Sequence, residues 1–516
     1  MTVARLISAA LLVTAIDTAH AVETESGRIE GVREPGVTVY KAVPFAAPPT
    51  GELRWRPPRP VEPWTGTRPA SHFAPACAQT GVSMPGETPP ETSEDCLYLN
   101  IWAPADAPSR APVLVWIHGG GFANGSAAMP LYWGDRLARR GIVVVTVAYR
   151  VGALGFLPHP ELTRESPGRG SGNYGLMDQI AALEWVKRNI AAFGGDPARV
   201  TIAGQSAGAM SVSILMASPR AKGLFHGAIG QSGGFFEPVQ IAPSHLLASA
   251  ERDGEAFARS VGAPSLAALR GLPVEAILKG NLPSGAHPVI EPNVLPAPPF
   301  DAFARGAHSD VPVLIGVNAQ EARALTDVRD VTAARFAAGI EKRWGRLPPP
   351  LVAAYPFETD EEARQARIAF ETDLRFGWDM WAWARLQRAT GKAPVFAYRF
   401  ERTPPFPPGG PHAGWGAGHF AELWYVFDHL GQEPWAWTDG DRTLAGAMAA
   451  YWTNFVKTGD PNAGGLPAWP RFTSDTGPLL VLDTQIAPGQ VARLSSLRVF
   501  DDVYAQLRGA PFPARR

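Results

Sequence analysis

The sequence predicts an α/β protein with a mostly parallel central sheet covered by helices on both faces. Its first sign is a series of continuous apolar runs of strand length, at residues 113–117, 142–149, 200–203, 311–317 and 395–400. Such runs are typical of strands buried on both faces. The second sign is helical periodicity between the runs: in residues 177–190, Ile180, Leu183 and Val186 recur at spacings of three. This alternation favours parallel strands joined by helices.

Composition excludes several other classes of protein. The chain has 516 residues with 47 basic and 48 acidic side chains, for a net charge of −1, so we expect no nucleic-acid partner. At 46% hydrophobic and 18% charged residues it is too apolar to be disordered. Its length would allow about three domains. The sequence contains no clear linker or repeat, however, and this favours one large domain with helical insertions between about residues 320 and 420.

The N-terminus has the pattern of a signal peptide over residues 1–21. A basic residue, Arg5, precedes the mostly apolar residues 6–16, and an A-x-A cleavage site follows at residues 19–21. An uncleaved membrane anchor is the alternative, but the run is shorter than the roughly 20 apolar residues that a bilayer requires. We therefore expect an exported protein without a membrane span, whose mature domain comprises residues 22–516. A Pro-rich stretch at residues 44–63 predicts loops near its start.

Only two cysteines occur, Cys77 and Cys96. In an oxidising compartment they could pair and close a loop, which would contribute on the order of 3 kcal/mol. Two buried free thiols are the alternative.

A serine nucleophile is indicated by the G-x-S-x-G pattern at residues 204–208, centred on Ser206. The chemistry requires a strand, a sharp turn and then a helix, so that the hydroxyl stands clear of the sheet. The apolar run 200–203 precedes Ser206 and the helix-forming residues 207–216 follow it. A second match at residues 230–234 surrounds Ser232, but glycines, phenylalanines and Pro238 follow it. We interpret Ser232 as a turn at the end of a strand.

An oxyanion hole is expected beside Ser206. A helix that begins just after the serine directs the free N–H of Ala207 toward the site. The glycine run at residues 118–122 follows the first core strand, so the N–H groups of Gly120 and Gly121 can supply the other donors. The alternative for the run alone is an ordinary glycine-rich turn.

The triad partners should follow the serine in the order acid, then histidine. Glu321 comes almost directly after the strand at residues 311–317, whereas Asp310 precedes that strand and Asp327 lies further beyond it. Three histidines come later: His412 in a Pro/Gly loop, His419 in a flexible Gly-containing segment, and His429 after an apolar run. We predict Glu321 and His419 as the pair, with His419 moving the proton and Glu321 orienting it.

Several ordered motifs resemble those of the type B carboxylesterases, the cholinesterase-like branch of the α/β-hydrolases. They lie at residues 93–100, 118–122, 173–179, 193–197, 204–208, 418–422 and 458–462. The resemblance implies the α/β-hydrolase fold and hydrolysis of small carboxylic esters through an acyl-enzyme intermediate. It also implies a triad of Ser206, Glu321 and His419, an oxyanion hole of Gly120, Gly121 and Ala207, and a Cys77–Cys96 disulfide.

Three positions depart from the family pattern. Gln205 stands where Glu is usual, Ala322 where Gly usually follows the acid, and Phe420 where Gly usually follows the histidine. The substitution at Phe420 should narrow the space beside His419.

Other functions have weaker sequence support. A dinucleotide-like glycine pattern at residues 170–175 does not follow a strand, and the chain contains neither C-x-x-C nor H-E-x-x-H, so we expect no cofactor and no metal. A binding or adhesion protein that has lost catalysis is the alternative from another class. A lipase or thioesterase is the alternative among enzymes. The sequence does not predict the oligomeric state.

Overall fold

The computed structural model describes residues 19–82, 84, 87–88, 90–105 and 110–514. Residues 1–18 of the predicted signal peptide therefore lie outside the described residues. Residues 19–21 are described, and they begin the edge strand β1, which pairs antiparallel with β2.

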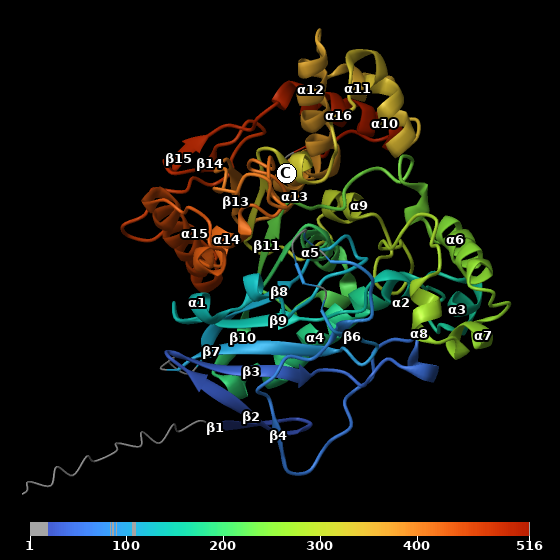
Figure 1. The fold of residues 1–516 in the computed structure, drawn as a ribbon, viewed down its shortest axis with the longest axis vertical. Coiled ribbons are helices and arrows are strands. Elements are labelled where there is room, and N and C mark those ends of the chain that lie inside the picture. The colour runs from blue at the N-terminus through green and yellow to red at the C-terminus, as the bar shows by residue number, and fades with distance from the viewer. Residues whose placement is uncertain (1–18, 83, 85–86, 89, 106–109, 515–516) are drawn as a thin grey trace, which may run out of the picture.

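One large twisted sheet runs through the molecule (Figure 1). In spatial order its strands are β1 (Ala19–Thr24), β2 (Gly27–Glu34), β3 (Val37–Pro44), β7 (Tyr98–Pro104), β9 (Val143–Val147), β8 (Ala111–Ile117), β10 (Gly195–Gln205), β11 (Gly227–Gln231), β12 (Val313–Asn318), β13 (Val395–Phe400), β14 (Leu479–Leu482) and β15 (Ala487–Gly489). β4 (Thr67–Pro69) pairs with β2, while β5 (Ala76–Cys77) and β6 (Thr92–Ser93) form a small separate sheet. From β9 to β14 all neighbours are parallel, and the flanking strands are antiparallel.

The helices are α1 (Asp135–Ala138), α2 (Gly152–Phe156), α3 (Pro160–Glu165), α4 (Tyr174–Asn189), α5 (Ala207–Ala217), α6 (Leu247–Ser260), α7 (Leu266–Gly271), α8 (Val274–Leu278), α9 (Pro299–Ala304), α10 (Phe336–Trp344), α11 (Pro349–Ala353), α12 (Asp360–Thr372), α13 (Trp378–Thr390), α14 (Leu423–Val426), α15 (Asp439–Thr458) and α16 (Leu494–Arg508). A π-helical turn, Asp373–Gly377, joins α12 to α13. Helices α10, α11, α12 and α16 gather at one end of the molecule (Figure 1).

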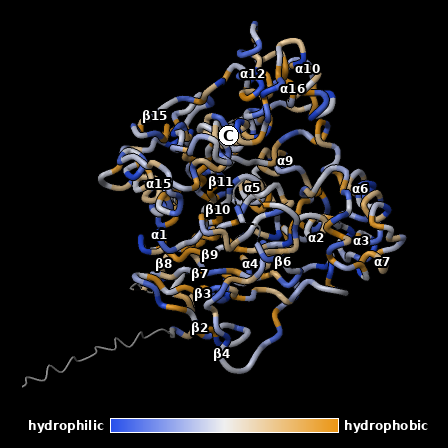
Figure 2. Tube along the Cα trace, viewed as in Figure 1, coloured by the Kyte–Doolittle hydropathy of each residue, from blue (hydrophilic) through white to orange (hydrophobic). Residues whose placement is uncertain are grey.

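The sheet divides the interior into two hydrophobic cores, because successive side chains of a strand point to opposite faces. In β8, Val113 and Val115 belong to one core, which also includes residues of α4, α5 and α13. Leu114 and Trp116 belong to the other core, with residues of α14 and α15. The hydrophobic residues, orange in Figure 2, gather along these central strands. Burial on both faces explains why the strands are continuously apolar, and it confirms the predicted α/β class.

The structure extends some predicted elements and adds others. β10 begins five residues before the apolar run at 200–203, and α4 begins at Tyr174 rather than near residue 177. The antiparallel strands β1, β2 and β3 were not among the predicted strands, whereas residues 45–63 are mainly loops, as expected.

Candidate active site

Ser206 occupies a sharp turn between a strand and a helix. β10 ends at Gln205 and α5 begins at Ala207, while Ser206 itself has φ 57° and ψ −126°. Both glycines of the motif are required by close packing: a Cβ on Gly204 would lie 2.4 Å from the carbonyl carbon of Gly208, and one on Gly208 would lie 2.0 Å from the carbonyl oxygen of Ile117. Ser206 is partly exposed although its sequence neighbours are buried. This geometry is that of a nucleophile elbow.

Ser232 lies in a similar backbone turn on the neighbouring strand. It follows the last residue of β11 and has φ 54°. Ser232 is fully buried, its hydroxyl has no hydrogen-bond partner among the described residues, and no α-helix begins between it and α6 at Leu247. Ser232 is therefore the strand-end turn that the sequence indicated.

Glu321 and His419 are in direct contact. The distance from His419 Nδ1 to Glu321 Oε2 is 2.6 Å, and both side chains are buried. The other carboxylate oxygen of Glu321 accepts the backbone N–H of Asn318 at 2.6 Å, at the end of β12. Because a carboxylate only accepts, Nδ1 is the protonated nitrogen in a neutral imidazole, which leaves Nε2 able to accept a proton.

Two aromatic rings and one amide surround the His419 imidazole. The Phe376 ring stacks on it at 4.6 Å between centroids with 20° between planes, and the Phe420 ring meets it at 4.6 Å and 66°. The Gln205 amide nitrogen lies 3.2 Å from His419 Nε2 and 3.4 Å from Nδ1. Gln205 thus connects the position next to Ser206 with the imidazole. Sequence reasoning missed Phe376, which lies in the π-helical turn and carries no local motif.

The three departures from the family pattern have different structural consequences. Phe420 has φ 74°, a left-handed conformation that favours glycine. Ala322 is fully buried without a positive φ, and its N–H donates to Thr372 Oγ1 at 3.2 Å. Gln205 places a neutral amide where a carboxylate would have charged the wall of the site. Phe420 does lie against His419, as the sequence led us to expect.

The glycine run lies beside Ser206. A Cβ on Gly119 would lie 3.1 Å from the Ser206 Cβ, and one on Gly120 would lie 2.1 Å from the carbonyl oxygen of Asn124. Gly120 and Gly121 have φ 108° and 62°, and nothing lies within 4 Å of a Cβ on Gly121. The run therefore brings exposed backbone close to the N-terminus of α5.

The buried side chain of His118 contacts the backbone of the glycine run. Burial lowers the pKa of His118 to about 4, so the ring is neutral at physiological pH. Its Nδ1 contacts the carbonyl oxygen of Gly119 at 2.8 Å, and the ring stacks on Tyr149 at 4.4 Å. The Tyr149 hydroxyl in turn donates to the His118 carbonyl oxygen at 2.9 Å.

A second buried carboxyl group, Glu422, lies behind the Glu321–His419 pair. It accepts hydrogen bonds from Asn318 Nδ2 at 2.5 Å and from Gln231 Nε2 at 3.1 Å. Burial, and secondarily the charge of Glu321, raise the pKa of Glu422 to about 7. Glu422 lies in the family motif at residues 418–422, but sequence reasoning gave it no role.

The alternative histidines and acids lie elsewhere. His429 contacts Asp135 Oδ1 at 3.0 Å, and the His412 ring packs among aromatic rings, 4.7 Å from Trp415. Asp310 accepts the backbone N–H of Lys392 at 2.8 Å, and Asp327 forms an exposed pair with Arg329. None of these contacts involves Glu321 or His419.

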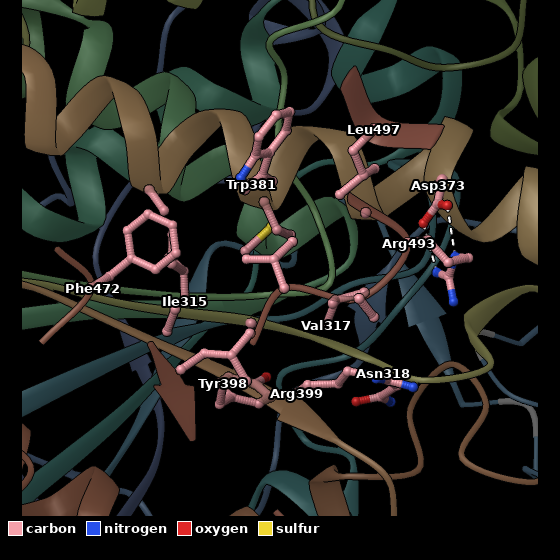
Figure 3. Close-up of a pocket in the computed structure, with 18 residues that line it drawn as sticks. Ile315, Val317, Asn318, Asp373, Trp381, Tyr398, Arg399, Phe472, Arg493 and Leu497 are labelled. Atoms are coloured by element: carbon pink, nitrogen blue, oxygen red, sulfur yellow. Dashed lines mark hydrogen bonds and ion pairs between the residues drawn. The ribbon is translucent and has the colours of Figure 1, made fainter. Parts of the chain in front are cut away.

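A cavity of about 60 Å³ lies against β12, the strand that leads to Glu321 (Figure 3). Apolar side chains such as Ile315, Phe472 and Trp381 form most of its wall, and Asn318 borders it. Dashed lines in Figure 3 join Asp373 to Arg493 at its edge. None of Ser206, Glu321 and His419 is among its lining residues, so this cavity is distinct from the space above the elbow.

Five buried aromatic residues of a size suited to line an acyl or alcohol pocket, Phe122, Trp378, Trp381, Trp383 and Trp424, lie in different parts of the structure. Trp381 lines the cavity of Figure 3, whereas Trp424 lines another pocket of about 500 Å³. Phe122 packs on Phe156 at 5.0 Å. Trp378 and Trp383 are buried in the core, Trp378 with its indole N–H on Asp501.

Cys77 and Cys96 form a disulfide with their Cα atoms 4.9 Å apart. Next to it, the Gln79 side chain accepts the N–H of Gly125 at 2.6 Å and donates to its carbonyl oxygen at 2.8 Å. The disulfide-closed loop is thereby tied to the segment that follows the glycine run. No helix in the described part of the chain has the length and apolarity needed to cross a membrane.

Comparisons with known proteins agree with this architecture. Residues 18–339 and 351–497 match the model of the carboxylesterase family. The fumonisin B1 esterase of Sphingopyxis macrogoltabida is 38% identical over 90% of this chain and 87% of that protein. The para-nitrobenzyl esterase of Bacillus subtilis is 36% identical, over 90% and 95% of the two chains.

Solved structures extend the likeness to the fold. A PNB esterase structure superposes with a TM-score of 0.81 at 33% identity, over 93% of this chain and 99% of that one. The Geobacillus stearothermophilus carboxylesterase EST55 gives 0.80 at 34% identity with the same coverage. Fold and relatives together define a carboxylic ester hydrolase with the α/β-hydrolase fold. The chain belongs to the carboxylesterase family, which confirms the resemblance that its motifs indicated.

Proposed function

We propose that the enzyme hydrolyses carboxylic esters through an acyl-enzyme intermediate on Ser206. The observation that carries this proposal is the 2.6 Å contact between His419 and Glu321 beside a nucleophile elbow. His419 removes the Ser206 proton as the hydroxyl attacks the ester carbonyl, and returns it to the leaving alkoxide. Water then attacks the acyl group by the same route, and Glu321 holds the imidazole tautomer and stabilises its cation.

The backbone N–H groups of Gly120, Gly121 and Ala207 bind the oxyanion in this mechanism. Support comes from Gly119, which abuts Ser206, and from the open space at Gly121. The first N–H groups of α5 have no partner within the helix, so they are free to stabilise negative charge.

Residues 1–21 act as a signal peptide and the mature chain, 22–516, works in an oxidising compartment outside the cytoplasm. The disulfide supports this proposal, since such bonds are rare in the reducing cytosol. N-terminal sequencing of the native protein from periplasm and medium tests it, and an intact Met1 would contradict cleavage.

The mechanism is tested with 4-nitrophenyl acetate, butyrate and octanoate and two serine variants. We expect Ser206→Ala to lower kcat by about 10⁴-fold or more. Ser232→Ala, at the second G-x-S-x-G, is the matched control and should retain activity. Wild-type rates in Ser206→Ala would refute the nucleophile, and a folded but inactive wild type would favour the binding or adhesion alternative.

A further inference from the structure

Arg375 places a cation close to the catalytic imidazole. It lies in the π-helical turn Asp373–Gly377, directly before Phe376, whose ring stacks on His419. The Arg375 guanidinium carbon is 5.5 Å from the centroid of the Phe376 ring and 5.5 Å from that of Trp344. The guanidinium and the His419 imidazole therefore both lie against the Phe376 ring.

Arg375 has no polar partner within the described residues. It makes no hydrogen bond or ion pair there, and its Nη1 atom is buried without a partner. Burial lowers the pKa of Arg375 to about 10, which still leaves it charged at neutral pH. A largely buried charge without a partner is costly, so an anion that reached it would be bound favourably.

The carboxylates near Arg375 are already engaged. Glu371 contacts Arg367 Nε at 2.6 Å through one oxygen, and Thr326 Oγ1 at 2.7 Å and Arg343 Nε at 3.6 Å through the other. Glu321 is occupied by His419 and Asn318. The carboxylates that act on Arg375 are thus committed to other partners, and part of the Arg375 side chain is exposed to solvent.

We propose that Arg375 binds a free carboxylate on the substrate, so that the enzyme prefers esters that carry a second, ionised carboxyl group. This inference rests on the proposed serine-esterase function. The planar guanidinium matches a carboxylate in a two-point contact, which a neutral acyl chain cannot make. The free carboxylate takes no part in the reaction: water cleaves the ester to an acid and an alcohol, and Arg375 acts as a specificity residue.

The test compares matched esters by pH-stat. Monoethyl glutarate against ethyl valerate places the carboxylate in the acyl half, and 3-(butanoyloxy)propanoate against propyl butanoate places it in the alcohol half. We expect Arg375→Met to lower kcat/KM by about 10- to 100-fold for the charged member of at least one pair. The neutral members should change less than about 3-fold, and the affected pair identifies the half that carries the carboxylate.

Further variants distinguish recognition from a structural role. Arg375→Lys should retain part of the preference for the charged ester, and Arg346→Met, at an exposed arginine, should leave both pairs unchanged. Equal losses on charged and neutral esters, or no loss on either, would overturn the proposal.

Inhibition of the wild-type enzyme by carboxylic acids tests the proposal without requiring that any variant folds. Glutarate should inhibit at about 10-fold lower concentration than valerate, and equal inhibition would overturn the proposal. Unimpaired neutral-ester hydrolysis by Ser206→Ala would refute the proposed function instead, so the two failures are distinguishable.

Discussion

The imidazole of His419 is held in place by contacts from several segments of the chain. Glu321 holds Nδ1, while Phe376 and Phe420 pack on the ring. Phe420 adopts φ 74°, a conformation that costs a residue other than glycine on the order of 1 kcal/mol. The strain is offset by packing, because Phe420 is only 4% exposed and its ring lies against the imidazole. Strain is tolerated here because packing fixes the backbone, as is common at functional sites.

Gln205 offers a test of how charge beside the imidazole sets the working pH. In Gln205→Glu a carboxylate would lie where the amide nitrogen is now 3.2 Å from His419 Nε2. An adjacent negative charge favours the imidazolium, which cannot act as a base. We expect the acidic limb of the pH–kcat/KM profile to move about one pH unit upward. Profiles on 4-nitrophenyl butyrate measure the shift.

The control for that variant is Gln205→Met, which has a similar shape and no charge. Its acidic limb should stay where the wild-type limb lies, even if its rate falls. An unshifted limb in Gln205→Glu would show that the contact between residue 205 and the imidazole does not control protonation.

At the scale of elements, the π-helical turn depends on an anchor from the C-terminal part of the chain. Asp373 begins the turn and accepts two hydrogen bonds from Arg493, at 2.6 and 2.7 Å. Tyr355 donates a third at 2.8 Å. Arg493 precedes α16, so this helix start and the turn that carries Phe376 are held together. The extra residue of a π-turn is frequently associated with functional sites.

Replacing the anchor should affect both stability and catalysis. Asp373→Asn leaves the partly exposed guanidinium of Arg493 without a countercharge, and we expect a loss of about 2–3 kcal/mol in the free energy of unfolding. Because Phe376 is released, kcat should fall while KM changes little. Urea unfolding and steady-state kinetics measure the two effects.

A carboxylate in an exposed pair is the appropriate comparison for Asp373. Asp327 pairs with Arg329 at the surface, and Asp327→Asn should leave the free energy of unfolding nearly unchanged. Equal effects of the two variants on the free energy of unfolding would mean that the Asp373–Arg493 pair contributes no more to stability than an exposed ion pair does.

These elements also show where prediction from sequence ends. β8, β9, β12 and β13 could be predicted because burial on both faces makes a strand continuously apolar. The π-turn could not, since residues 373–377 have no local signal and the anchor Arg493 is 120 residues away in sequence.

The candidate site likewise contains residues that the sequence predicts and contacts that it does not. Ser206 and the glycine run carry local motifs, and chain order selects Glu321 and His419. The contacts of His419 with Phe376 and Gln205, and of Asn318 with Glu422, arise from tertiary packing between distant segments. No spacing rule reveals such contacts, because they depend on where helices settle on the sheet.

At the scale of the whole molecule, Glu422 and Asp379 are buried and Glu237 is mostly buried, and within the described residues no arginine or lysine pairs with any of the three. Burial raises the pKa of Glu237 and of Glu422 to about 7, and burial together with the charge of Glu237 raises that of Asp379 well above its ordinary value of 3.8. In each case the folded protein keeps a proton that the unfolded chain releases above about pH 4. The unfolded state then binds fewer protons, so the free energy of unfolding decreases as pH rises from about 4 through 7.

Asp379 allows this dependence to be measured at one residue. Asp379→Asn removes the titrating group but keeps an oxygen that can accept the Phe236 N–H, which Asp379 Oδ1 now accepts at 3.2 Å. Each unit of pH over which the folded state alone holds the proton costs about 1.4 kcal/mol. The variant should therefore gain stability relative to wild type as pH rises, with little difference at pH 4.5 and the largest at pH 8. Urea unfolding across this range provides the comparison. A stability difference that is constant with pH would mean that Asp379 titrates alike in the folded and unfolded states, and that the pH dependence of the whole molecule has its origin in other groups.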